Sequence, residues 1–138
     1  MPSKKKTSKK APPPLASAVV VAGFPSPADQ YAESPLDLNE RMVRNPPATF
    51  FVRVAGDSME DAGIFDGDTL VVDKSLEAQN NDVVIASVNG EFTVKFFRRR
   101  GAAVSLEPAN PKYKPIQFSS DMELQVWGVV TGLVRRFK

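Results

Sequence analysis

From Thr49 onward, short apolar runs alternate with polar turns that contain glycine, asparagine or aspartate. The runs are rich in valine, isoleucine and phenylalanine, which is typical of β-strands. Asn89-Gly90 is the strongest turn signal, since a tight hairpin needs positive φ at both positions. The short connections between runs predict a mainly β fold of antiparallel sheets. We expect strands at 50–54, 70–73, 82–88, 91–100 and 104–107, and one long or two short strands within 122–134.

The N-terminal part of the chain follows a different pattern. Residues 1–14 are rich in lysine, serine and proline, which predicts disorder. Residues 15–22 are small and β-branched and suit an extended segment, which glycine and prolines in 23–27 then interrupt. A short helix is expected within 29–33 and 36–43.

These patterns divide the 138 residues into three predicted parts. Residues 1–22 form a flexible, disordered basic arm, residues 23–46 a linker with a short helix, and residues 47–138 the β domain. The arm holds five lysines and no acidic residue, whereas the remainder has 13 basic and 16 acidic residues. Because the acidic body offers no basic stripe, sequence-specific DNA binding is not expected, and Arg98–Arg100 is interpreted as a solvated hairpin end.

The chain has neither histidine nor cysteine, which limits the chemistry available to it. A disulfide framework, a thiolate metal site and a zinc centre are therefore not expected. The acidic residues within 60–68 do not have the spacing of a calcium loop. We accordingly predict no metal and no cofactor.

The basic start followed by the apolar run 15–22 resembles a secretory signal. Three consecutive prolines, Pro12–Pro14, separate the two features, and the run is short for a signal core. No apolar stretch approaches the length of a membrane-spanning helix. We therefore expect a cytoplasmic protein without a membrane partner.

Two residues carry the strongest sign of chemistry, a serine in the turn Gly56–Met59 and Lys95 in an apolar run. A serine nucleophile needs a base, and without histidine the candidates are a carboxylate, the N-terminal amine or a neutral lysine. Lys95 is the candidate among these because burial can depress a lysine pKa from its ordinary value near 10.4.

Each feature also has a structural explanation. Serines in such turns are commonly turn residues or helix caps, and Ser58 could cap a short helix that begins at Met59. Lys95 suits an edge strand protected against aggregation. Ala22-Gly23, a small residue followed by glycine in an extended segment, is typical of a bond that a protease cleft accepts, or of a simple strand end.

Taken in order, several motifs resemble the LexA/UmuD family of self-cleaving Ser-Lys peptidases. The resemblance covers about residues 22–138 and is highly specific because several motifs agree in order. It rests on Ala22-Gly23, FVRVAGDSM at 51–59, GIFDGD at 63–68, GEFTVK at 90–95, LEPANPKY at 106–113 with Pro115-Ile116, and VWGVV at 126–130.

The resemblance implies curved antiparallel sheets of the kind shared with signal peptidases. It also implies that Ser58 is the nucleophile and Lys95 the general base. Backbone N–H groups of Ser58 and Asp57 would form an oxyanion hole, and the cleaved bond would be Ala22–Gly23.

Within that family the 22 residues that precede Gly23 are too few for a DNA-reading domain, so the chain resembles the UmuD-type members. The resemblance then implies an SOS-response homodimer, cleavage stimulated by a RecA–single-stranded DNA filament, and a UmuC-type Y-family translesion polymerase as partner. The alternatives are a non-catalytic dimerising module that docks to a polymerase, and a relative of type I signal peptidase, which shares the dyad but needs a membrane anchor.

Overall fold

The computed structural model describes residues 11–16, 19–20, 22–23, 33–118 and 123–138. Internal contacts divide the chain into two units, Met1–Arg41 and Met42–Lys138, and each is described by itself. Disorder is predicted for residues 1–14. Of these, residues 1–10 lie outside the described residues, and Pro14 belongs to a strand.

The N-terminal unit contains a two-stranded antiparallel sheet of β1 (Pro14–Ala16) and β2 (Glu33–Pro35). Of the extended segment predicted over 15–22, Leu15 and Ala16 pair with β2, and residues 17–18 and 21 lie outside the described residues. The helix predicted within 29–33 is wrong at Glu33, which pairs in β2, and residues 29–32 lie outside the described residues.

The helix predicted within 36–43 is present as α1 (Leu38–Met42). The carboxylate of Asp37 accepts a hydrogen bond of 2.9 Å from the backbone N–H of Asn39, which satisfies one free donor of the first turn. A 3₁₀ turn at Pro46–Ala48 then leads into the β domain.

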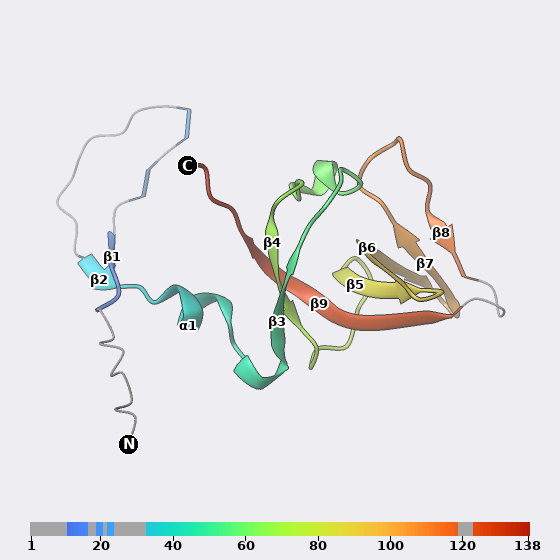
Figure 1. Ribbon diagram of the computed structural model, residues 1–138, viewed down its shortest axis with the longest axis horizontal. Coiled ribbons are helices and arrows are strands. Elements are labelled where there is room, and N and C mark those ends of the chain that lie inside the picture. The colour runs from blue at the N-terminus through green and yellow to red at the C-terminus, as the bar shows by residue number, and fades with distance from the viewer. Residues whose placement is uncertain (1–10, 17–18, 21, 24–32, 119–122) are drawn as a thin grey trace, which may run out of the picture. The chain divides into compact units, whose positions relative to one another are not determined.

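The second unit is a seven-stranded antiparallel sheet in the order β3-β4-β9-β5-β6-β7-β8 (Figure 1). The prediction of a mainly β, antiparallel fold is therefore confirmed. Its strands are β3 (Thr49–Arg53), β4 (Thr69–Asp73), β5 (Val83–Val88), β6 (Glu91–Arg100), β7 (Ala103–Glu107), β8 (Ile116–Gln117) and β9 (Leu124–Val134).

Four antiparallel pairings separate β3 from β6 in this order, so these two strands run in the same direction. β9 is one long strand and pairs with both β4 and β5 (Figure 1). Its register shifts once against each partner, leaving Trp127 and Thr131 as extra residues. Such bulges bend a strand and increase its twist, which allows β9 to pair with β4 on one side and β5 on the other.

Apolar side chains fill both faces of this sheet. On one face Leu70 and Ile85 pack with Met59, which is 1% exposed. On the other face Val84 and Leu106 form a second cluster. Successive side chains of a strand point to opposite faces, so the continuous apolar run at 83–86 in β5 follows from its burial on both sides.

The Arg98–Arg100 cluster lies at the end of β6, where the chain turns at Gly101 into β7. Arg98 forms a 2.9 Å ion pair with Glu107, and Arg100 is exposed. The structure therefore agrees with a solvated hairpin end. No helix in the described part of the chain is long and apolar enough to cross a membrane.

Gly128 lies where β9 passes closest to β4. A Cβ atom at this position would meet Val72 Cγ1 at 2.6 Å and the backbone oxygen of Asp73 at 3.0 Å. Gly128→Ala should therefore lower the free energy of unfolding by about 1–3 kcal/mol, because the backbone of β4 cannot move aside. Gly132→Ala is the matched control, since its Cβ would meet only the terminal methyl of Met42, which can rotate away. Urea denaturation of both variants measures the difference, and equal losses would contradict it.

Candidate active site

Ser58 lies in the loop that follows β3. The loop turns at Gly56, whose φ of 93° favours glycine, and the N–H of Gly56 donates to Asp66 Oδ1 at 2.7 Å. A 3₁₀ turn at Glu60–Ala62 follows, and its N-cap is Met59 without any side-chain cap. The alternative that Ser58 caps this turn is therefore wrong, and its hydroxyl can make a different contact.

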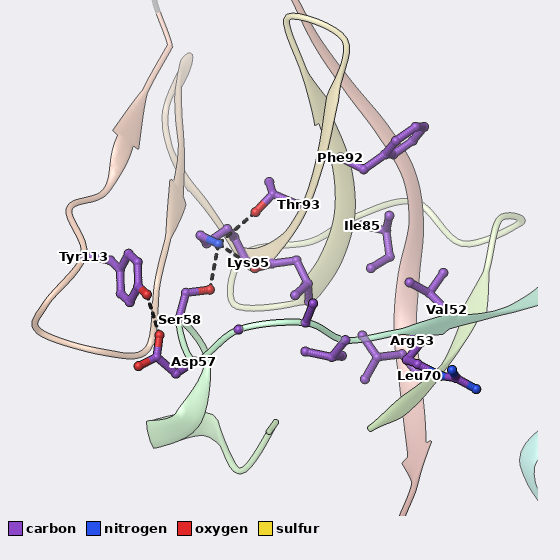
Figure 2. Close-up of a pocket in the computed structure, with 14 residues that line it drawn as sticks. Val52, Arg53, Asp57, Ser58, Leu70, Ile85, Phe92, Thr93, Lys95 and Tyr113 are labelled. Atoms are coloured by element: carbon purple, nitrogen blue, oxygen red, sulfur yellow. Dashed lines mark hydrogen bonds between the residues drawn. The ribbon is translucent and has the colours of Figure 1, made fainter. Parts of the chain in front are cut away.

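The loop after β7 holds the Ser58 turn from the other side. The N–H of Ala109 donates to Ser58 O at 2.8 Å, and Asn110 Nδ2 donates to Asp57 O at 2.8 Å. The hydroxyl of Tyr113 donates to the Asp57 carboxylate (Figure 2). These three contacts fix the main chain on both sides of the Asp57–Ser58 peptide bond. Sequence reasoning assigned them no role, and only the ordered motif at 106–113 marked this loop.

Lys95 reaches Ser58 from the neighbouring wall of the site. Its amine lies 2.9 Å from Ser58 Oγ, 2.8 Å from Thr93 Oγ1 and 3.0 Å from Val94 O (Figure 2). Only 9% of the residue is exposed, and its amine contacts Ser58 instead of solvent. The alternative that Lys95 protects an exposed strand edge is therefore wrong.

Burial lowers the pKa of the Lys95 ammonium below the ordinary lysine value. All three of its hydrogen-bond partners are uncharged oxygens. Within the described part of the chain, no carboxylate lies within ion-pair distance of this amine. The neutral form of the amine is therefore more favoured at this site than in an exposed lysine.

Thr93 is a site residue that sequence reasoning missed. It lies two residues before Lys95 on the same face of β6, and its hydroxyl accepts from the amine at 2.8 Å. This contact fixes the direction of the long lysine side chain. The signal was present in the sequence, because a hydroxyl two positions from a strand lysine shares its face.

A groove of about 410 Å³ runs past the Ser58–Lys95 pair. Its lining is mostly apolar away from the pair and comes from β3, β4, β5 and β6, with residues such as Val52, Leu70, Ile85, Phe92 and Val94 (Figure 2). β3 is an edge strand of the sheet, and β7 pairs with β6 only from Phe96 onward. Among the described residues, the open edges of β3 and β6 therefore flank the groove and run in the same direction. This arrangement suits an extended peptide.

The residues of the predicted oxyanion donors, Asp57 and Ser58, line this groove. Among the described residues, the backbone N–H groups of Asp57 and Ser58 donate to no protein acceptor. Both donors are thus available to a ligand oxygen near Ser58 Oγ.

The predicted cleavage residues belong to the N-terminal unit. Ala22 and Gly23 are exposed and lie in a bend, and Gly23 has a φ of 106°. Val19 and Val20 before them are 81% and 92% exposed. The structure thus brings Ser58 and Lys95 together in one unit and presents the Ala22–Gly23 bond on the surface of the other.

The acidic residues after Ser58 have structural partners. Asp66 accepts from the N–H of Gly56, and the buried carboxylate of Asp68 pairs with Arg135. No group of three or more potential metal-ligating side chains occurs in residues 33–118 and 123–138 or the shorter described segments.

Comparison with known proteins identifies the class. The Peptidase S24-like family model matches residues 14–131, and the chain therefore belongs to this family. Protein SamA of Salmonella typhimurium strain LT2 is 46% identical over 123 residues, covering 89% of this chain and 85% of SamA. Protein MucA of Escherichia coli is 47% identical over 113 residues, covering 81% and 77% of the two chains.

The LexA repressor of Pseudomonas chlororaphis is 42% identical over 118 residues, which are 85% of this chain and 58% of the repressor. The resemblance to the LexA/UmuD family is therefore confirmed. With it, a UmuD-like function in the SOS response is confirmed at the level of the family, which comprises self-cleaving serine peptidases.

The burial of Lys95 has a measurable consequence. We expect its amine to titrate at a pH below the ordinary lysine value, because desolvation penalises the charged form. NMR titration of the lysine side chains, with Lys95 assigned by its absence from Lys95→Ala, measures this midpoint. Ser58→Ala should retain a lowered midpoint, since burial and not the serine is the cause. An ordinary midpoint in the wild-type protein would contradict this prediction.

Proposed function

We propose that this protein is a serine peptidase that cuts its own Ala22–Gly23 bond with Ser58 and Lys95. The observation that carries the proposal is the 2.9 Å contact between Lys95 Nζ and Ser58 Oγ in a largely buried site. A base must lie within hydrogen-bond reach of the proton that it removes, and this pair meets that requirement.

The reaction follows from that contact. Neutral Lys95 accepts the Ser58 hydroxyl proton as Oγ bonds to the carbonyl carbon of Ala22. The N–H groups of Ser58 and Asp57 stabilise the resulting oxyanion. The bond from that carbon to the Gly23 nitrogen then breaks, and the Lys95 ammonium returns its proton to the leaving amine. Water, deprotonated by neutral Lys95, finally attacks the ester carbon, the bond to Ser58 Oγ breaks, and the Lys95 ammonium returns the proton to Oγ, which releases residues 1–22 from residues 23–138.

The groove accounts for how the substrate is held. An extended segment that enters between β3 and β6 can bond to both strand edges while its apolar side chains face the apolar lining. Val19 and Val20, exposed in the N-terminal unit, are of the kind that this lining favours. Because the substrate is part of the same chain, its effective concentration is high, and a modest catalyst suffices. A docked segment also excludes water from Lys95 and so favours the neutral amine.

The biological setting proposed here is that of the UmuD-type members. The protein acts as a homodimer, and a RecA–single-stranded DNA filament stimulates cleavage by shifting the arm toward its docked state. The shortened product joins a UmuC-type Y-family polymerase for translesion synthesis, and the reaction needs no cofactor. Membership of the S24-like family and the similarity to SamA and MucA support this setting.

Self-cleavage of the purified protein without any activator should accelerate as the pH rises. Below the pKa of Lys95 the neutral fraction grows about tenfold per pH unit, and the rate should follow it to an alkaline plateau. Intact-mass measurement after incubation between pH 6 and 10 follows both products. A flat rate across this range would contradict the role of Lys95.

Variants test the assigned residues directly. Ser58→Ala and Lys95→Ala should each lower the plateau rate at least about a thousandfold, and Gly23→Glu should block cutting by obstruction. Ser105→Ala and Lys114→Ala are matched controls, since no hydrogen bond or ion pair joins these side chains to the Ser58 loop in the described part of the chain. A wild-type chain that stays intact at pH 10 would favour the non-catalytic polymerase-docking module, and cleavage of an added preprotein would favour a signal-peptidase-like activity.

A further inference from the structure

An ion pair at the far end of β9 lies outside the groove and has no part in the proposed reaction. Arg135 follows directly after β9, and its Nε lies 2.6 Å from Asp68 Oδ1 and its Nη2 2.7 Å from Asp68 Oδ2. Asp68 is only 1% exposed, and the Arg135 side chain is 34% exposed. A two-pronged pair of this kind fixes both the distance and the orientation of its partners.

Arg135 also holds the rest of the turn that contains Asp68. Its Nη2 donates to Gly63 O at 2.8 Å, and its guanidinium lies 4.7 Å from the centre of the Phe65 ring. The second oxygen of Asp68 accepts from the N–H of Phe65 at 2.7 Å. One arginine therefore closes the turn from Gly63 to Asp68 through contacts at its beginning, middle and end.

This turn is bonded to the chain on both sides of Ser58. Before the serine, the N–H of Gly56 donates to Asp66 Oδ1 at 2.7 Å. After the serine, the N–H of Ile64 donates to Met59 O at 3.2 Å. The position of Ser58 therefore depends on the turn that Arg135 closes.

Val54, which follows β3 and leads into the Ser58 loop, is bonded to the same turn. Val54 and the turn exchange two backbone hydrogen bonds of 2.8 Å, one from Val54 N–H to Asp68 O and one from Gly67 N–H to Val54 O. Val54 also lines the groove. Movement of Asp68 would thus be transmitted to the strand end that leads into the Ser58 loop.

We infer that Arg135 is a positioning residue for the Ser58 nucleophile, acting through Asp68 and the turn Gly63–Asp68. The inference rests on the proposed function of Ser58 and Lys95. Arg135 contacts neither residue, so its removal should leave the Lys95 amine buried beside Thr93 Oγ1 and Val94 O while Ser58 Oγ loses its fixed distance from it. Misplacement of reacting groups by about 1 Å can cost about a hundredfold in rate.

The experiment compares three full-length variants under conditions where each is folded. Arg135→Met keeps the apolar stem and should lower the alkaline plateau of self-cleavage by about ten- to a hundredfold, with the pH midpoint unchanged. Arg135→Lys keeps one charge without the two-pronged geometry and should recover part of the rate. Arg136→Met removes the same charge from the adjacent exposed residue and should cleave like the wild type.

Two measurements separate positioning from simple loss of stability. Rates are divided by the folded fraction from circular dichroism, and amide hydrogen exchange compares residues 54–62 with β5. Positioning predicts a low rate per folded molecule and faster exchange in 54–62 but not in β5. A wild-type rate per folded Arg135→Met molecule, or a shifted pH midpoint with an unchanged plateau, would overturn the inference. Absence of cleavage in the wild type would instead count against the proposed function itself.

Discussion

The site depends on the cost of placing an amine where little water can reach it. Lys95 is almost fully buried, and its neighbours offer hydroxyl and carbonyl oxygens but no carboxylate. These partners satisfy the donors of the amine without compensating a full positive charge. The same domain handles Asp68 in the opposite way, since the buried carboxylate receives an arginine and its pKa is lowered. Burial without a charged partner thus holds one group toward neutrality, whereas an arginine partner holds the other toward full charge.

The arrangement of the sheet explains why the serine and the lysine meet. Ser58 follows the end of edge strand β3, and Lys95 lies within β6, four pairings away in the sheet order. The bulges of β9 add twist between these strands, and the apolar clusters fill both faces. The groove between the two strands keeps two backbone edges open beside the pair. The features that complete the fold therefore also create the place for an extended peptide.

Much of this domain follows from local patterns in the sequence. The alternation of apolar runs and turns predicted each long strand, because side-chain period and turn chemistry are local properties. The two-residue strand β8 was missed, since it follows a proline-rich loop and pairs with β7 only after the sheet has formed. The alternatives for Ser58 and Lys95 stayed open for a related reason. Whether β6 is an edge strand depends on strand order, which is not encoded in the run around Lys95 itself.

The lysine base proposed here would give this fold a form of restraint that histidine would not. The ordinary pKa of histidine lies near neutrality, so a histidine base is active without any further event. A lysine is mostly charged at neutral pH unless its surroundings are dry, and water can enter the groove beside Lys95. A segment lying in the groove would remove that remaining water, so binding of the substrate and creation of the base become one event. Under the proposed function, such coupling would keep the chain intact until a signal favours docking of its own arm.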